Sequence, residues 1–411
     1  MTAYEKLVAS DIRKSPDKQL IEQIRQRYPT EKEIDRILTK KMTLRSGPGF
    51  ISIPVGDLAA GVQKLIEHNV GYPVKLANTK WLPGGASKLQ MMFDLHWFGP
   101  GKTGGETIVT PLVLRMEPPA SVTESSRRRE FQVFQAVAGI VPVPTTYWMD
   151  PDGDFLPHPA IVYGFARGVA KPSKDANKVS GLGQNYGPEL RKKLAPQFVG
   201  LLARIHNIDV GTLDGLEDFE FPVAGSNEAV IKQVNYCRRL WEEDRLEEEP
   251  MLEIAYQWLI KNAPPIDHVS LVHGDYRSGN FLFDEASGEI TAWLDWEGAV
   301  LGDRHRDLTY ATLYTFQHLD EDGKTPLASG MMPEEEMFKA YERASGLSVD
   351  PARIVYYGVF NRYLATVLSL GASARAAYGG KTHQDVLLNY VAGIGYPILA
   401  DLREYFEKVV A

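Results

Sequence analysis

Residues 271–308 read LVHGDYRSGNFLFDEASGEITAWLDWEGAVLGDRHRDL, and this stretch determines the predicted fold. Two short apolar runs, 281–283 and 290–294, are separated by the turn-forming residues 284–289. That pattern predicts a β-hairpin, because two strands joined by a short turn pair antiparallel. The hairpin returns the chain to its starting point, so residues just before the first strand and just after the second should lie together.

Three polar residues flank this hairpin: Asp275 and Asn280 before it and Asp295 after it. The hairpin brings the Asp295 carboxylate beside the Asn280 amide, where both can bind one cation, and it leaves Asp275 free. Oxygen ligands of this kind suit Mg²⁺, which binds through few carboxylates plus substrate phosphates. Phosphoryl transfer needs such ligands together with a carboxylate that orients or deprotonates the attacking hydroxyl. Any one of these residues alone would be interpreted as a turn or cap residue, but their combined spacing favours a kinase site.

The same residues carry a family resemblance. His273-Gly274-Asp275 with Asn280, followed by Leu294-Asp295-Trp296-Glu297, resembles the HGDxxxxN and (I/L)DW(E/D) motifs of the aminoglycoside phosphotransferase and choline kinase-like family. The resemblance runs from about residue 82 to the C-terminus. Family members often continue with GDPxxDL, whereas this chain has GDRHRDL at 302–308. The resemblance implies that Asp307 holds the catalytic loop through hydrogen bonds.

This family shares the fold of protein kinases. The resemblance therefore implies an α+β, protein-kinase-like two-lobed fold, with a small antiparallel-sheet N-lobe and a large, mainly helical C-lobe. Ahead of it, apolar spacing predicts helices near 18–27, 31–41 and 57–67. The expected organisation is an N-terminal helical extension at 1–68, an N-lobe carrying the nucleotide-binding sheet and helix at 69–166, and a C-lobe at 167–411.

The resemblance implies a nucleotide site in the N-lobe. Aromatic and branched runs at 88–98 and 107–116 predict two strands, and the small residues of the turn at 82–88 let backbone N–H groups approach phosphates. The resemblance also implies a basic residue that anchors the nucleotide on the strand at 107–116, where this chain has Arg115 in place of the usual lysine. Its expected partner is Glu130 on the helix at 125–137. The residues assigned to nucleotide binding are Gly84, Gly85, Ser87, Arg115 and Glu130. The neighbouring arginines 127–129 are expected to face solvent.

Residues 161–168, IVYGFARG, resemble the segment that connects the two lobes in this family. The resemblance implies that backbone groups around Tyr163 and Phe165 bind the purine. Backbone contacts leave little trace in side chains, so this segment does not distinguish ATP from GTP. ATP is the expected nucleotide, with GTP as the alternative. Mg²⁺ and this nucleotide are the expected cofactor and co-substrate.

Composition excludes several other classes of protein. The chain has 411 residues and a formal net charge of −8, from 45 Lys and Arg against 53 Asp and Glu, so nucleic acid is not an expected partner. Cys237 is the only cysteine, which excludes an intrachain disulfide and fits a reducing compartment. The start of the sequence lacks the apolar segment of a signal peptide, and the apolar stretch 354–370 contains Arg362. A cytoplasmic protein without a membrane partner is expected.

We therefore expect a small-molecule kinase that transfers the γ-phosphoryl group to a hydroxyl, with Asp275 as base and Mg²⁺ held by Asn280 and Asp295. A protein kinase is disfavoured because the eight positions from Asp295 to Asp303 leave no room for a long activation segment. Two alternatives stay open: an aminoglycoside O-phosphotransferase, and a catalytically silent nucleotide-binding pseudokinase.

Two features bear on the acceptor. The string HGDYRSGN, with Arg277, resembles the subgroup associated with acyl-CoA dehydrogenases, which implies a hydroxyacyl-CoA or another hydroxylated metabolite. The segment 241–253 has seven acidic residues against a single arginine, and such a segment could line a pocket for polycationic aminoglycosides. A solvated helix face is the favoured interpretation of these acids. The oligomeric state is not indicated.

Overall fold

A computed structural model describes residues 11–82, 88–175 and 181–410. Its helices are α2 (Lys18–Arg27), α3 (Lys32–Thr43), α4 (Val55–Val70), α5 (Arg127–Val137), α6 (Gly187–His206), α7 (Glu228–Asp244), α8 (Pro250–Lys261), α9 (His305–Tyr310), α10 (Glu334–Ser345), α11 (Pro351–Thr366), α12 (Ala374–Tyr378) and α13 (Asp385–Val410). The expected N-terminal helices near 18–27, 31–41 and 57–67 are confirmed as α2, α3 and α4.

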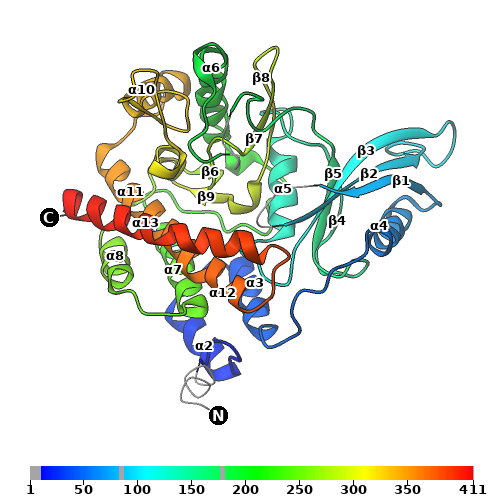
Figure 1. The fold of residues 1–411 in the computed structure, drawn as a ribbon, viewed down its shortest axis with the longest axis horizontal. Coiled ribbons are helices and arrows are strands. Elements are labelled where there is room, and N and C mark those ends of the chain that lie inside the picture. The colour runs from blue at the N-terminus through cyan, green and yellow to red at the C-terminus, as the bar shows by residue number, and fades with distance from the viewer. Residues whose placement is uncertain (1–10, 83–87, 176–180, 411) are drawn as a thin grey trace.

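The N-lobe is built on a five-stranded antiparallel sheet in the order β1-β2-β3-β5-β4. Its strands are β1 (Lys75–Trp81), β2 (Leu89–Trp97), β3 (Ile108–Met116), β4 (Thr146–Asp150) and β5 (Ala160–Gly164). Along β2, buried and half-buried residues alternate, as expected for a strand whose two faces differ in burial. One face packs against α4, and the opposite side of the sheet is covered by α5 (Figure 1).

The C-lobe is mainly helical and carries three short antiparallel strand pairs: β6 (Ser270–Val272) with β9 (Val300–Gly302), β7 (Phe281–Asp284) with β8 (Glu289–Trp293), and β10 (His318–Leu319) with β11 (Pro326–Leu327). The β7–β8 pair is the hairpin predicted from residues 281–294. The α+β, two-lobed architecture with a sheet-based N-lobe and a helical C-lobe is therefore confirmed.

The N-terminal extension contacts both lobes. Helices α2 and α3 contact α7 of the C-lobe, whereas α4 contacts β1 and β4 of the sheet (Figure 1). The division into units at 1–68, 69–166 and 167–411 stays a prediction. None of the helices in the described ranges combines the length and apolar character needed to cross a membrane.

Candidate active site

A buried carboxylate organises the loop between β6 and β7. Asp307, on α9, accepts hydrogen bonds from the backbone N–H groups of His273 at 2.7 Å and Gly274 at 2.8 Å. Its Oδ2 also lies 3.2 Å from Nε2 of His206. Gly274 has φ +82°, and a Cβ there would meet the carbonyl oxygen of Gly298 at 2.1 Å, so only glycine fits. The expected role of Asp307 in holding this loop is thus confirmed.

His273 links the two parts of the motif. Its Nε2 lies 3.0 Å from the carbonyl oxygen of Leu294, and its Nδ1 accepts from the backbone N–H of Asp275 at 3.2 Å. Burial lowers the pKa of His273, which favours the neutral ring with hydrogen on Nε2, as this pair of contacts requires. A neutral His273 therefore fixes the Asp275 backbone against the end of the hairpin.

The Asp275 carboxylate is held by its neighbours and remains accessible. Oδ1 accepts from Nε of Arg277 at 2.8 Å, and Oδ2 accepts from Nδ2 of Asn280 at 2.6 Å. The hydroxyl of Tyr310 also hydrogen-bonds to Asp275. The Asp275 side chain is 24% exposed, so it can meet a ligand from solvent. Arg277 stacks over Phe316, with 4.8 Å between the guanidinium carbon and the ring centroid.

The hairpin brings Asp295 back to Asn280, since the backbone N–H of Leu294 donates to the Asn280 carbonyl oxygen at 2.8 Å. Asp295 has left-handed backbone angles, φ +66° and ψ +45°, a conformation that aspartate and asparagine tolerate better than most residues. Its side chain is 29% exposed and pairs with Arg115. An amide oxygen and a carboxylate form an oxygen-only donor set, which fits Mg²⁺. No group of three or more His, Cys, Asp or Glu residues suited to a metal ion occurs among the described residues.

Arg115 stands on β3 and is 5% exposed. Besides Asp295, it contacts Glu297, at 3.0 Å from Nη2, and Glu130 on α5, at 3.3 Å from Nε. Burial opposes the guanidinium charge, but the surrounding carboxylates raise the pKa of Arg115 well above its ordinary value. The structure thus brings together three of the residues singled out in the sequence, Arg115, Glu130 and Asp295.

Sequence reasoning missed the rest of this charged cluster. Glu297 accepts from Lys88 Nζ at 3.2 Å and from Arg127 Nη2 at 3.2 Å, and Arg127 also pairs with Glu117 at 3.0 Å and with Glu130. Burial opposes ionisation of Glu297, but the cations around it lower its pKa. The only sequence signal for Glu297 was its place in the LDWE motif.

The expectation that arginines 127–129 face solvent is wrong for two of them. Arg127 and Arg129 are 2% and 4% exposed. Arg129 pairs with Glu31 at 3.1 Å and stacks over Phe219 at 3.8 Å. Arg128 alone is open to solvent, with 34% of its side chain exposed. Each of the two buried arginines pairs with a carboxylate from a distant part of the chain, Arg127 with Glu297 and Arg129 with Glu31.

The predicted purine-binding segment, 161–168, begins within β5 and continues beyond its end. Tyr163 is 7% exposed, and burial raises the pKa of its hydroxyl to about 12. Phe165 is 39% exposed, and its backbone N–H donates to the carbonyl oxygen of Pro111 at 3.0 Å, so a purine would have to contact other backbone groups here. Gly84, Gly85 and Ser87 lie outside the described residues.

The acidic segment 241–253 differs from the expected solvated face. Glu243 and Asp244 are 1% and 3% exposed, and both pair with Lys41 on α3, at 2.8 and 2.9 Å. Glu242 accepts from Arg238 at 2.6 Å. Glu248 pairs with Arg245, and Glu253 pairs with Arg238. Five of the seven acids of this segment are therefore in ion pairs, although Glu247, Glu248 and Glu249, beyond the end of α7, are exposed or half-buried.

The chain is similar to several known proteins. The family described as "Phosphotransferase enzyme family" matches residues 102–351. Among curated proteins, the chain is 26% identical over 370 residues to "Probable acyl-CoA dehydrogenase IBR3" of Arabidopsis thaliana, covering 78% of this chain and 42% of that protein. It is 24% identical to human "Acyl-CoA dehydrogenase family member 11", covering 67% and 35%. The chain thus spans less than half the length of these relatives.

Two solved structures share the fold. A crystal structure of a putative aminoglycoside phosphotransferase from Ralstonia eutropha aligns with a TM-score of 0.59 at 21% identity, covering 85% of this chain and 98% of that one. A thermostable mutant of aminoglycoside phosphotransferase APH(4)-Ia, in ternary complex with AMP-PNP and hygromycin B, aligns with a TM-score of 0.50 at 16% identity, covering 83% and 98%.

Proposed function

Because the chain belongs to the phosphotransferase enzyme family, we propose that it is a small-molecule kinase that moves the γ-phosphoryl group of ATP to a hydroxyl group. The observation that carries this proposal is the placement of Asp275. Its carboxylate is fixed by Arg277 and Asn280 and lines a cavity of about 110 Å³ together with Gly274 and Tyr310. A carboxylate held this way can orient an incoming hydroxyl and accept its proton.

The transfer is a single displacement. As the hydroxyl oxygen attacks the γ-phosphorus, its proton passes to the Asp275 carboxylate, and the bond between the γ-phosphorus and the β–γ bridging oxygen breaks to release ADP. Asn280 and Asp295 would hold Mg²⁺, which neutralises charge on the phosphates when bound. Arg115 would bind phosphate oxygens, positioned by Glu130, because a guanidinium stays charged and can fork to two oxygens.

The remaining nucleotide contacts are proposed from the resemblance. Gly84, Gly85 and Ser87 would approach the phosphates through backbone N–H groups, and the segment around Tyr163 and Phe165 would hold the purine. The AMP-PNP complex of the APH(4)-Ia mutant supports an adenine nucleotide over GTP.

For the acceptor we propose a hydroxylated metabolite of the acyl-CoA type. The plant and human relatives are named as acyl-CoA dehydrogenases, which supports this class. An aminoglycoside acceptor has less support, because Glu243 and Asp244 already pair with Lys41 and Glu242 with Arg238.

An ADP-release screen tests the proposal. The protein is incubated with Mg²⁺ and ATP against hydroxyacyl-CoA esters, sugars, choline-like amines and aminoglycosides, with Asp275→Asn as the blank and Asp214→Asn, a change at an exposed surface position, as the matched control. We expect Asp275→Asn to lose about 10²- to 10⁴-fold in turnover while binding nucleotide within a few-fold of the unmutated protein.

Each outcome of this screen has a defined meaning. Undiminished turnover by Asp275→Asn would remove Asp275 from its role. Efficient phosphorylation of an aminoglycoside would replace the proposed acceptor. Nucleotide binding without ADP release from any class would favour the pseudokinase alternative.

A further inference from the structure

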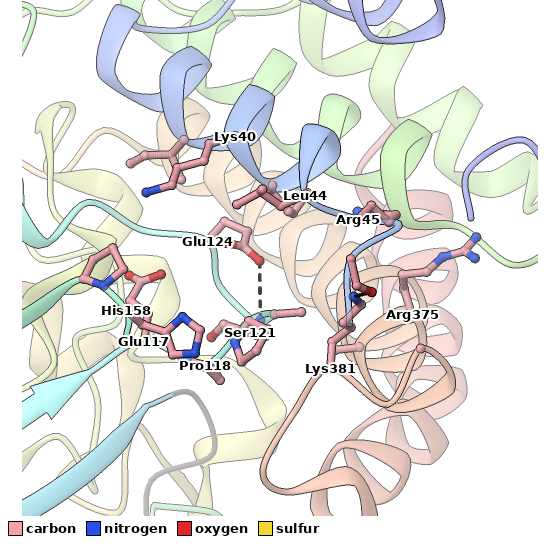
Figure 2. Close-up of a pocket in the computed structure, with 18 of the residues that line it drawn as sticks. Lys40, Leu44, Arg45, Glu117, Pro118, Ser121, Glu124, His158, Arg375 and Lys381 are labelled. Atoms are coloured by element: carbon pink, nitrogen blue, oxygen red, sulfur yellow. Dashed lines mark hydrogen bonds between the residues drawn. The ribbon is translucent and has the colours of Figure 1, made fainter. Parts of the chain in front are cut away.

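A cavity of about 1060 Å³ lies beside the candidate active site. Its walls come from α3 and the following loop (36–53), the loop from β3 to α5 (117–127), the loop between β4 and β5 (151–159), and the segment around α12 (372–381) (Figure 2). The volume is at the upper end of the range for small-molecule sites, about 300 to 1,000 Å³. It has room for a molecule larger than a simple sugar or amine.

Much of this cavity is built by parts of the chain beyond the matched family region. The family match covers residues 102–351, whereas the walls at 36–53 and 372–381 lie outside it. Backbone hydrogen bonds join the walls: Phe50 N–H donates to the Gly380 carbonyl oxygen at 2.8 Å, and Ala120 N–H donates to that of Lys381 at 3.1 Å. The cavity therefore extends beyond the region that the family match covers.

The lining of the cavity has an excess of positive charge. Eight basic residues line it: Lys14, Arg36, Lys40, Lys41, Arg45, Arg127, Arg375 and Lys381. Five acidic residues line it: Asp11, Glu117, Glu124, Asp152 and Asp244. The excess of three opposes the net charge of −8 on the whole chain. The local charge of the cavity therefore favours an anionic ligand, whereas the negative net charge of the whole chain does not.

Three of these cations form no ion pair within the described parts of the chain: Lys14, Lys40 and Lys381. Arg45 and Arg375, by contrast, pair with Asp244 and Asp11. Lys381 donates to the backbone carbonyl oxygens of Gly47 and Pro48. Figure 2 shows Lys40 and Lys381 on different sides of the cavity. Each can offer an ammonium group to a ligand without breaking an existing ion pair.

The cavity also has apolar walls and adjoins the catalytic loop. The apolar side chains in its walls include Ile37, Leu44, Ile51, Ile53 and Tyr378. Glu124 and Ser126 line both this cavity and the smaller one that contains Asp275. Burial raises the pKa of Glu124 to about 7, so this boundary residue adds less negative charge than an ordinary glutamate.

We propose that the large cavity binds the non-reacting end of the acceptor, and that this end is amphipathic and carries phosphate groups. The proposal rests on the proposed kinase function, because it assumes that the hydroxyl of the same molecule reaches Asp275 past Glu124. Lysine ammonium groups bind phosphate as point charges, and the apolar walls suit a hydrocarbon segment. Two sources share this chemistry: a phosphorylated carrier joined to an acyl chain, and a lipid with a phosphate headgroup.

Titration calorimetry with two probes, coenzyme A and dodecyl phosphate, tests the site. Saturating Mg²⁺ and AMP-PNP keep the nucleotide site filled, so the probes report on the second cavity. The variant is Lys40→Ala/Lys381→Ala, and the matched control is Lys18→Ala/Lys64→Ala, which removes two exposed lysines that do not line the cavity. We expect the Kd of the preferred probe to rise at least tenfold in the variant and less than twofold in the control.

A second variant guards against misfolding. Lys381 also holds the loop at 47–48, whereas Lys40 is exposed and forms no ion pair with a described residue, so Lys40→Glu should keep the fold and still weaken binding. Preference for coenzyme A would assign the phosphates to a carrier, and preference for dodecyl phosphate would assign them to a lipid headgroup. Absence of binding of both probes, or equal binding by the unmutated protein and both cavity variants, would overturn the proposal.

The same measurements separate this proposal from the kinase function. Lysine-dependent probe binding without ADP release from any acceptor would refute the kinase and, with it, the link to an acceptor, leaving only an anion-binding cavity. ADP release that is unchanged in Lys40→Glu, without lysine-dependent probe binding, would refute the role of the cavity and leave the kinase intact.

Discussion

Three aspartates of the site have the same side chain and different tasks, which their surroundings assign. Asp307 is fully buried and accepts hydrogen bonds from two backbone N–H groups, so it stabilises the loop between β6 and β7. Asp275 is partly exposed and fixed by side chains, so it can meet a substrate. Asp295 sits at a left-handed turn facing Arg115, where a divalent ion could compete with the guanidinium.

The Asp295 carboxylate should control the metal dependence of nucleotide binding. Asparagine is the suitable replacement, because it tolerates the positive φ of +66° that would strain alanine. We expect Asp295→Asn to weaken Mg²⁺–ATP binding at least tenfold and to bind metal-free ATP no worse than before, since the phosphate charge loses a metal site while Arg115 is kept.

Calorimetric titration with ATP in Mg²⁺ and in EDTA measures both affinities. Asp214→Asn, at an exposed position, is the control for the change of charge. If Asp295→Asn kept the full difference between the two conditions, Asp295 would not be the metal ligand.

At the residue scale, the sequence predicted the residues of the loop and hairpin better than those of the charged cluster. Asp275, Asn280 and Asp295 all fall within one stretch, so local spacing was enough to relate them. Lys88 and Arg127 escaped notice because Glu297, which pairs with both, is remote in sequence. Glu130 lies three residues after Arg127, but such a pair also forms on exposed helix surfaces, so the local pattern did not indicate burial.

At the scale of elements, α5 is the clearest case of a helix whose charges are not on its solvent face. Its first turn carries three successive arginines, of which Arg127 points into the cluster with Glu117, Glu130 and Glu297. The helix therefore joins the sheet to the catalytic loop through ion pairs as well as through apolar packing.

The same substitution at adjacent positions of α5 tests this arrangement. Arg127→Ala removes one of the cations that pair with the buried carboxylates of the cluster, and removing one partner of a buried ion pair costs about 3–5 kcal/mol. Arg128→Ala removes an exposed pair with Asp152, whose side chain is 48% exposed, and should cost about 1 kcal/mol or less. Urea unfolding of both variants measures the difference. Equal free energies of unfolding would mean that the cluster does not stabilise the fold.

Periodicity in the sequence predicted where elements begin and end, but it did not predict which other elements pack against them. The helix expected near 57–67 is observed as Val55–Val70, because apolar spacing reports which residues share a face. The acids at 241–253 were interpreted as solvated because the segment itself does not show which residues of other elements pack against it. The two acids that are buried, Glu243 and Asp244, pair with Lys41 from α3, and no pattern within α7 indicates that partner.

At the scale of the whole molecule, the N-terminal extension connects the two lobes. Helix α3 contacts α7, Glu33 accepts a hydrogen bond at 2.6 Å from Ser126 at the start of α5, and α4 packs on the sheet. The loop between α3 and α4 forms part of the wall of the large cavity. The sequence predicted these helices, yet an amphipathic pattern specifies an apolar face and not the surface that covers it.

A leucine pair near the end of α3 tests whether this docking stabilises the whole fold. Leu38 is 0% exposed and lies in the same apolar cluster as Trp241 and Leu252, whereas Leu44, just beyond the helix, is 60% exposed. Leu38→Ala should lower the free energy of unfolding by about 2–5 kcal/mol, through lost burial and the space left behind. Leu44→Ala should change it by about 0.5 kcal/mol or less.

Urea titrations followed by fluorescence would give both values, with a lower midpoint and an unchanged slope expected for Leu38→Ala. An unchanged slope means that the extension unfolds together with the C-lobe, because the slope follows the surface exposed in the transition. If Leu38→Ala instead produced a separate early transition and left the main midpoint in place, α2 and α3 would form a unit that unfolds independently. The cavity would then have a wall that could detach without unfolding the kinase lobes.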